Sequence, residues 1–423
     1  MIKLMKAGII SVAAALAITG CTSSNDTEQS ESGAAATVEG SWIGSKNTTR
    51  INTSDPATAA VIVSQSLWMA TSDDNRPGGV ILANPDDWQS TLASADLIHH
   101  PNNGPVLFVN KDGIPEVTLN ELKRLKPTGV DMNDGIQAIL VGDLDEKVEV
   151  EIKGLGLKTD HIKGDNPAAA AQAIDAYYTK VAKENPASVI VGSMESEAYT
   201  LPAVNWIAHM PEPLLYVKKD EIPVETVEAL KTRGGKANIY ILGPESVISV
   251  NVEEQLGQYG KAVRIAGKDP YENAVAFAQY KDPVTGFGWG ITTPGHNFSF
   301  VSEDTHALAL AAAPFSHLGK HAPLLLTEED QMPESLRNYV MSIQPKYKMS
   351  PTEGPYNHAW ITGGRDAISI AAQGEIDSML EIVSESGTGH GSHGGGGSTD
   401  AETEPVPGEE GGHDMSDMPG MNH

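Results

Sequence analysis

Cysteine is almost absent from this 423-residue chain, which contains only Cys21. An intrachain disulfide is therefore impossible, because it needs two cysteines. Long hydrophobic runs are also missing: beyond the N-terminus no stretch of roughly 18 apolar residues occurs, so no later segment is expected to span a membrane. Basic residues are scarce, with 29 Lys and Arg against 56 Asp and Glu and a formal net charge of −27. So acidic a surface repels nucleic acid and anionic lipid and argues against either as a partner.

The N-terminus has the parts of an export signal. Lys3 and Lys6 supply positive charge, and residues 7–18 form an apolar run too short for a permanent membrane helix. The run ends in a sequence that looks like a lipobox, Leu16-Ala17-Ile18-Thr19-Gly20-Cys21. This pattern predicts a lipoprotein signal peptide over residues 1–20 and a lipid such as palmitate on Cys21, holding the chain at the extracytoplasmic face of the cell membrane. The alternative is an ordinary signal peptide with a chance cysteine.

Two segments have compositions typical of disorder. The predicted tether, residues 21–45, is rich in Ser, Glu, Ala and Thr, and the predicted tail, residues 384–423, is rich in Gly, Glu, Ser and Pro. Neither segment has enough hydrophobic residues to form a core. We therefore expect a flexible linker before the folded body and a disordered acidic tail after it.

The tail also concentrates soft metal ligands. Three methionines recur at every third position near its end, and four histidines lie before and around them. Thioether and imidazole groups favour copper, above all Cu(I). The tail is therefore a candidate copper site, although a solubilising tail with incidental Met and His residues is the alternative. The candidate ligands are His413, Met415, Met418, Met421, His423, His390 and His393.

The middle of the chain contains one pattern three times. In residues 105–115, 213–223 and 323–333, two prolines stand ten residues apart and an aspartate lies three residues before the second proline. The three copies recur at intervals of 108 and 110 residues, and a helical pattern and a strand ending in glycine follow each copy. The sequence therefore predicts three tandem repeats. Their predicted bounds are residues 46–150, 151–256 and 257–383.

Each repeat is expected to alternate parallel strands with helices. Short apolar runs typical of strands buried on both faces occur at residues 79–83, 188–192 and 289–292. Before each run, an Asp or Asn precedes a proline, which predicts a helix start: the Asx side chain caps free backbone N–H groups, and proline loses nothing at the first helical position. The predicted caps are Asp55, Asn166 and Asp269. The fold class is α/β, with three Rossmann-like units of mostly parallel sheet packed about a pseudo-threefold axis.

Three motifs of the third repeat are distinctive. They are Arg264-Ile265-Ala266-Gly267-Lys268-Asp269-Pro270-Tyr271-Glu272-Asn273-Ala274, Ala322-Pro323-Leu324-Leu325-Leu326 and Gly363-Gly364-Arg365-Asp366-Ala367-Ile368-Ser369. They resemble the cell wall-binding repeat type 2, a family found in threes on Gram-positive surface proteins, and the resemblance covers residues 46–383. It implies binding of an anionic cell-wall or envelope polymer in basic clefts between repeats. The candidate contacts are Arg50, Arg264 and Asp269.

Two departures from the family limit what the resemblance implies. Proline replaces the family's second arginine in every repeat, at Pro56, Pro167 and Pro270, and the chain as a whole is strongly acidic. The resemblance therefore implies the fold more firmly than the polymer.

No motif of a known enzyme class is present, since the sequence has no Walker loop, dinucleotide fingerprint, HExxH or GxSxG. The leading hypothesis is a non-enzymatic surface lipoprotein that binds polymer. The alternatives are a copper-binding lipoprotein acting through its tail and an α/β envelope enzyme with its active site at the carboxyl ends of the strands.

Other histidines carry only weak hypotheses. His99 and His100, before Pro101, are expected to lie in an exposed turn. Polar residues in the long insertion of the third repeat offer a divalent-metal site, although scattered loop residues are the commoner explanation. These residues are His296, Glu303, Asp304, His306 and His317.

Replacing Cys21 by serine tests the predicted anchor. The variant should accumulate as a precursor with an intact signal and no lipid, because the acceptor thiol is gone. Mass spectrometry of the N-terminus and labelling with a fatty acid measure this, and Ser23→Ala is the control that should be processed normally. Wild-type protein released into the medium with an unmodified N-terminus other than Cys21 would contradict the prediction.

Overall fold

The structure is a computed structural model that describes residues 42–318 and 320–386. Cys21, the predicted signal peptide and the seven candidate copper ligands of the tail lie outside the described residues. Within these residues no helix is long and apolar enough to cross a membrane.

Three four-stranded parallel sheets form the body, and all three have the same strand order. The first is β4-β3-β5-β6 (Val106–Phe108, Val80–Ala83, Ala138–Val141, Thr159–Ile162). The second is β8-β7-β9-β10 (Leu214–Val217, Ser188–Ser193, Ala237–Leu242, Gly260–Ile265). The third is β12-β11-β14-β2 (Leu324–Thr327, Asn297–Ser302, His358–Thr362, Thr48–Ile51), and β1 (Trp42–Gly44) adds to β2 in antiparallel orientation. A small separate sheet pairs β13 (Lys346–Tyr347) with β15 (Val383–Ser384). The predicted α/β class with mostly parallel sheets is confirmed.

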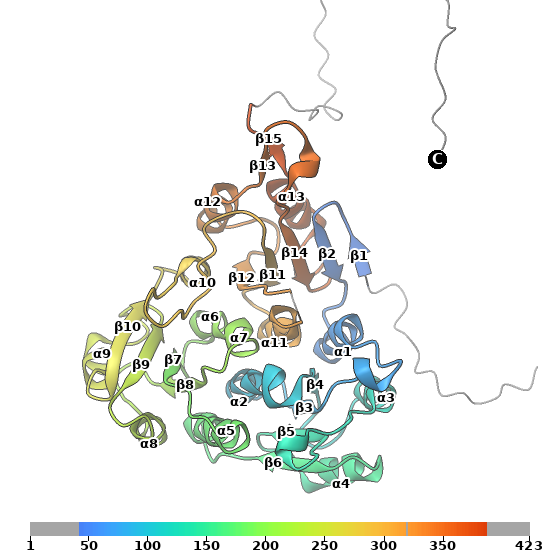
Figure 1. The fold of residues 1–423 in the computed structure, drawn as a ribbon, viewed down its shortest axis with the longest axis vertical. Helices are drawn as coiled ribbons and strands as arrows, with labels where there is room; N and C mark the ends of the chain where they lie inside the picture. The colour runs from blue at the N-terminus through green and yellow to red at the C-terminus, as the bar shows by residue number, and fades with distance from the viewer. Residues whose placement is uncertain (1–41, 319, 387–423) are drawn as a thin grey trace, which may run out of the picture.

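The first strand of each repeat lies in the sheet of the preceding repeat. The strands β6 and β10 extend the sheets of the first and second repeats, next to β5 and β9. For the third sheet no further repeat follows, and the N-terminal strand β2 pairs with β14 instead. The three sheets therefore close into a ring, and Figure 1 shows them around the centre of a roughly triangular body.

One predicted strand is wrong. Residues 289–292 of the third repeat form no strand, and the equivalent strand is β11, which begins at Asn297. Gly288 and Gly290 flank Trp289 with φ angles of 94° and 67°. Such positive φ values break an extended backbone.

The helices also recur in register. In the three repeats, the helix before the sheet's central strand is α1 (Pro56–Leu67), α5 (Pro167–Ala182) and α10 (Pro270–Gln279). The next is α2 (Trp88–Ser94), the pair α6 (Glu197–Thr200) and α7 (Ala203–Ile207), and α11 (His306–Ala312). The third is α3 (Glu116–Leu125), α8 (Val224–Lys231) and α12 (Glu334–Ser342), and the last is α4 (Glu146–Gly154), α9 (Val250–Leu256) and α13 (Ile370–Leu380). Short helical turns are η1 (Asp73–Asn75), η2 (Ala95–Leu97), η3 (Ile98–Asn102), η4 (Asp131–Asn133), η5 (Ala313–Ser316) and η6 (Pro351–Glu353).

The first helix of every repeat begins as the sequence suggests. The side chains of Asp55, Asn166 and Asp269 accept the backbone N–H three residues on, at distances of 2.8, 2.9 and 2.8 Å. Proline occupies the first turn in all three helices. The cap thus satisfies a backbone donor that the helix leaves without a partner.

A basic residue at the start of each repeat fastens the fourth strand of each sheet. Arg264 donates to the carbonyl of Gly243 at 2.7 Å, and an imidazole nitrogen of His161 lies 3.0 Å from the carbonyl of Gly142. Arg50 makes the equivalent contact to Gly363 at 2.7 Å, and it is fully buried. Each glycine ends a strand with a positive φ. These three contacts therefore join consecutive repeats.

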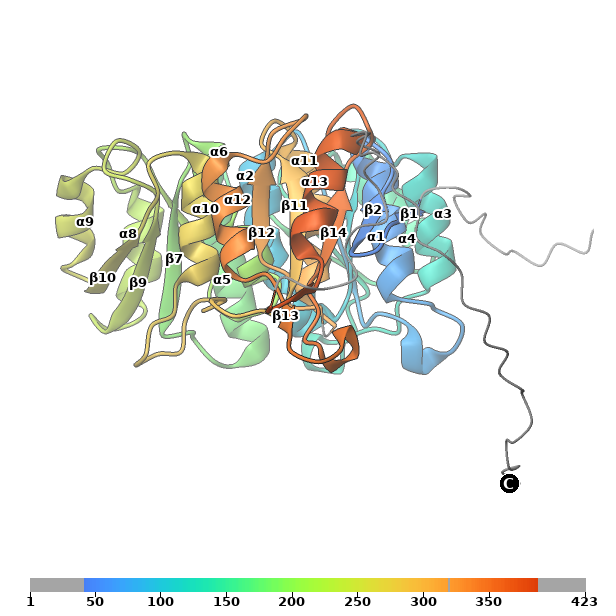
Figure 2. The ribbon, with the colours of Figure 1, turned by 90° about the horizontal axis from the view of Figure 1, so that it is seen from above.

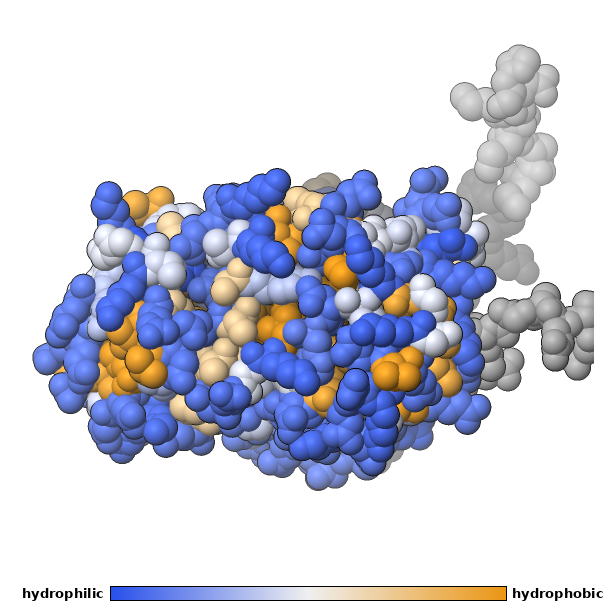
Figure 3. Space-filling model, turned by 90° about the horizontal axis from the view of Figure 1, so that it is seen from below, coloured by the Kyte–Doolittle hydropathy of each residue, from blue (hydrophilic) through white to orange (hydrophobic). Residues whose placement is uncertain are grey.

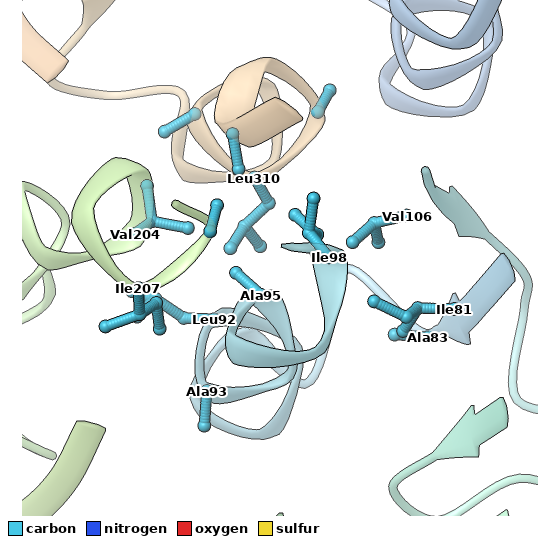
Figure 4. Close-up of a cluster of buried hydrophobic side chains, with 14 of the residues drawn as sticks. Ile81, Ala83, Leu92, Ala93, Ala95, Ile98, Val106, Val204, Ile207 and Leu310 are labelled. Carbon is cyan, nitrogen blue, oxygen red and sulfur yellow. The ribbon is translucent and has the colours of Figure 1, made fainter. Parts of the chain in front are cut away.

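The helices α2, α7 and α11 meet at the centre of the ring (Figure 1). Figure 4 shows Leu310 of α11, Val204 and Ile207 of α7, and Ala95 and Ile98 of the first repeat converging on one another. All five are essentially inaccessible to solvent and belong to one hydrophobic cluster that reaches all three repeats. The described body is therefore one packed unit rather than three independent domains.

The strands of the three sheets run through the thickness of the body, as Figure 2 shows for β7, β12 and β14. One face therefore carries the starts of the strands and the opposite face their ends; we call them the amino face and the carboxyl face. Figure 3 shows a side of the body on which hydrophilic residues dominate and apolar patches are small and separate. That side offers no extended apolar surface for docking.

Arg50 should be essential for ring closure. Replacing it by methionine keeps the bulk but leaves the carbonyls of Gly363 and Gly364 and the side chain of Gln373 without their donor. We expect a loss of roughly 2–4 kcal/mol in the free energy of unfolding, measured by denaturant titration. The exposed Arg365 is the control, because Arg365→Met should change stability by less than about 0.5 kcal/mol. Equal effects of both substitutions would refute a role for Arg50 in closure.

Candidate functional site

Three histidines meet on the axis of the ring at the amino face. His99 lies in η3, His209 follows α7 by two residues, and His317 follows η5 directly. Each therefore ends the central helical segment of its repeat. One ring nitrogen of each lies within 4.8 Å of one from each of the others, and we call this group the axial histidines. His99 was expected in an exposed turn, and that prediction is wrong, because packing of the three repeats half-buries it.

The axial histidines lie in a poorly solvated environment. Burial lowers the pKa of His317 to about 4, and the neighbouring His99 and His209 lower it further. Burial likewise lowers the pKa of His209 to about 4, with His321 and His99 contributing. These two imidazoles are therefore neutral at physiological pH. His100, the exposed neighbour in sequence, stacks on His99 with ring centroids 4.3 Å apart.

A cavity of about 450 Å³, the axial cavity, lies beside these histidines on the amino face. His209 belongs to both, and Trp206, Trp289 and His321 form part of the wall. The indole N–H of Trp289 is buried and has no hydrogen-bond partner among the described residues. The cavity therefore combines aromatic surface with an unused hydrogen-bond donor.

The charge of the axial cavity is opposite to that of the chain. Lys281 and Lys320 line it together with His209, His296 and His321, and its lining includes no aspartate or glutamate. Lys281 donates to the carbonyl of Gly288 at 2.9 Å, and Lys320 lies 5.1 Å from the centre of the Trp360 ring. Within the described residues neither lysine forms an ion pair. Both ammonium groups can therefore attract an anionic group.

Two grooves on the carboxyl face differ from the axial cavity. The larger, of about 570 Å³, lies between the second and third repeats and is lined by four carboxylates and two basic residues. Both bases are already paired: Lys268 with Glu272, and Arg337 with Glu375. The smaller groove, of about 430 Å³, lies at the preceding boundary and includes Lys163 and Asp165. Neither groove is a basic cleft of the kind that the family resemblance implies.

The candidate polymer contacts named from the sequence have structural roles here. Arg50 is completely buried, and Arg264 is bound to Gly243 and Glu253, with its guanidinium largely shielded from solvent. Asp269 caps α10 and lines the larger carboxyl-face groove. Of the three, only Asp269 is positioned to touch a ligand.

The five polar residues of the third repeat do not form one site. His306 begins α11 at the carboxyl face, where it pairs with Glu197 at 2.8 Å, and Glu303 and Asp304 precede it. His317 lies beyond the other end of the same helical segment, at the amino face. His296 lines the axial cavity. The helix thus separates residues that are close in the sequence.

Two signals in the sequence were available for the site. The axial histidines are 110 and 108 residues apart, close to the spacing of the repeats. The cavity was harder to find, because its lysines and tryptophans come from irregular segments around residues 281–289 and 320 that have no counterpart in the other repeats.

The chain resembles known proteins of the cell wall. Residues 264–373 match the model of the family described as cell wall binding domain 2 (CWB2). The chain is 29% identical over 168 residues to the "Amidase enhancer" of Bacillus subtilis (strain 168), covering 40% of this chain and 22% of that protein. It is 25% identical over 231 residues to "N-acetylmuramoyl-L-alanine amidase LytC" of the same organism, covering 54% of this chain and 42% of that protein. The chain therefore spans less than half the length of these curated relatives.

Solved structures share the fold. Cwp6 from Clostridium difficile superposes with a TM-score of 0.63 at 18% identity, covering 79% of this chain and 48% of that one. Cwp8 from the same organism gives a TM-score of 0.61 at 19% identity, covering 79% and 52%. The family match indicates association with the cell wall at the cell surface or envelope. Residues 264–373 of the chain, and with them the third sheet and its helices, belong to the cell wall binding domain 2 family.

Proposed function

We propose that the chain is a non-enzymatic envelope protein that binds an anionic cell-wall or envelope polymer through the axial cavity. The observation that carries the proposal is the charge of this cavity, which presents two lysines and three histidines and no carboxylate in a chain of net charge −27. The family match of residues 264–373 supports the wall as the source of the ligand.

The shape of the cavity suits a segment of polymer. Its volume of about 450 Å³ lies within the range of small-ligand sites, so one or two units of a polymer fill it. The ring of Trp289 offers an apolar surface, and its indole N–H offers a donor to a hydroxyl or an acidic oxygen. Lys281 and Lys320 would then pair with the negative groups.

Membrane attachment belongs to the same proposal. A lipid on Cys21 would hold the protein at the outer face of the membrane, and the polymer site would connect it to the envelope beyond. The amidase relatives leave the alternative of an envelope enzyme open to assay, and the proposal assigns no catalytic residue to this chain.

Substituting the two cavity lysines tests the polymer site. The double variant Lys281→Gln/Lys320→Gln should bind purified cell walls roughly tenfold more weakly, the factor that about 1.4 kcal/mol produces. Sedimentation of the full chain with walls measures this. The control is Lys163→Gln/Lys268→Gln, which removes two lysines from the carboxyl-face grooves and the same net charge. Equal losses in both variants would show a general effect of charge, and no loss in the first would refute the axial cavity as the site.

We propose copper binding as a second activity, located in the tail. Met415, Met418 and Met421 recur at every third position between His413 and His423, and thioether sulfur selects Cu(I) over Zn²⁺ and Ca²⁺. Calorimetry under anaerobic, reducing conditions should show that replacing the three methionines by leucine removes most Cu(I) binding. Replacing Met69, Met341 and Met349, three exposed methionines of the body, is the control. Unchanged Cu(I) uptake in the tail variant would leave the tail without this role.

A further inference from the structure

We propose that the axial histidines His99, His209 and His317 bind one divalent transition-metal ion, with Zn²⁺ as the preferred ion. Each of the three repeats supplies one of these ligands, so the site exists only when the ring is assembled. It lies in the folded body and is separate from the candidate copper ligands of the tail.

In each axial histidine, one ring nitrogen has a partner and the other is left for a metal. Nδ1 of His99 lies 2.7 Å from the carbonyl of His209, which leaves Nε2. Nε2 of His317 lies 2.9 Å from Oδ1 of Asn103, which leaves Nδ1. Metal-binding histidines have this arrangement, because a hydrogen bond from the second nitrogen fixes the tautomer and the ring orientation.

His209 gives the clearest sign of an unused ligand. Its Nε2 lies 3.0 Å from Nδ1 of His321, while its own Nδ1 is buried without a hydrogen-bond partner among the described residues. A buried polar atom without a partner destabilises a folded protein, and most such atoms are satisfied. A metal ion on the axis would satisfy this nitrogen.

The charge and chemistry of the group select the type of ion. Three neutral imidazoles suit zinc and its neighbours in the first transition row, whereas Ca²⁺ and Mg²⁺ prefer oxygen ligands. The lowered pKa values of His209 and His317 keep both rings neutral at physiological pH, so no proton has to be displaced from them. The neutral ligands leave both positive charges of the ion available to a fourth, negative ligand.

The geometry requires only local adjustment. In tetrahedral zinc sites with three histidines, bonds of about 2.1 Å place the nitrogens about 3.3 Å apart. The three nitrogens here lie within 4.8 Å of one another, so small side-chain rotations bring them to bonding distance. Three ligands related by a pseudo-threefold axis occupy one face of a tetrahedron. The fourth position then lies on the axis, as in zinc sites that keep an open position.

Zinc binding to the full chain tests the proposal. The background is a chain in which the tail histidines His390, His393, His413 and His423 are replaced by glutamine, so that they cannot contribute. Calorimetry should show one Zn²⁺ per chain. His99→Gln, His209→Gln and His317→Gln should each weaken binding at least about tenfold, since even an outer partner of a metal ligand contributes that much.

The matched control is His306→Gln, which removes an imidazole from the opposite end of the same central helix. It should bind Zn²⁺ like the background, and circular dichroism without metal establishes that each variant is folded. His317 is buried, so if its variant does not fold, the half-buried His99 still decides the question. Co²⁺ in place of Zn²⁺ should give the strong visible absorption of four-coordinate cobalt, and His99→Gln should abolish it. Absence of a stoichiometric Zn²⁺ in the background, or equal affinities for His99→Gln and His306→Gln, would overturn the proposal. Because the test uses Zn²⁺ alone, its outcome does not depend on polymer binding.

Discussion

The body depends on the pairing of its first described segment with its last sheet. The strand β2 lies parallel to β14, and a contact such as that between Thr49 and His358 joins residues 309 positions apart. Without β2 the third sheet would end at β14, whose backbone groups would then be open to pairing with other chains. Closing so long a loop costs entropy that grows only slowly with its length. The buried guanidinium of Arg50, bonded to two carbonyls and a glutamine, stabilises this closure.

Closure creates an axis on which equivalent residues meet. Once three similar units surround a centre, any position at the end of the central helical segment is brought together three times. At the level of Val204 and Leu310 the result is a hydrophobic core (Figure 4), and one turn beyond the helices it is the group of axial histidines. A site of this kind needs only one favourable residue per repeat, whereas a site within one repeat needs several residues from different elements.

Local features of the fold were predictable from the sequence, and those that depend on assembly were not. Asp55, Asn166 and Asp269 act within three residues of chain, so their capping is visible in the sequence. The exchange of first strands between repeats is not, because an apolar strand fits either neighbouring sheet equally well. The axial histidines lie six, four and six residues before the repeated prolines Pro105, Pro213 and Pro323, and this difference in loop length displaces His209 from alignment with the other two. Glycines with positive φ explain the misplaced strand at residues 289–292.

The placement of charge has a further consequence for binding. Grooves on the carboxyl face recur at repeat boundaries, and a polymer gripped there would contact the ring at more than one place. The axial cavity lies at the centre and includes residues of a single unusual loop, so the proposed function gives each ring one polymer site. A single site gains nothing from avidity, since avidity requires two linked binding events. The lipid predicted on Cys21 would provide the second attachment, because a protein confined to the membrane meets the adjacent envelope polymer at a high effective concentration.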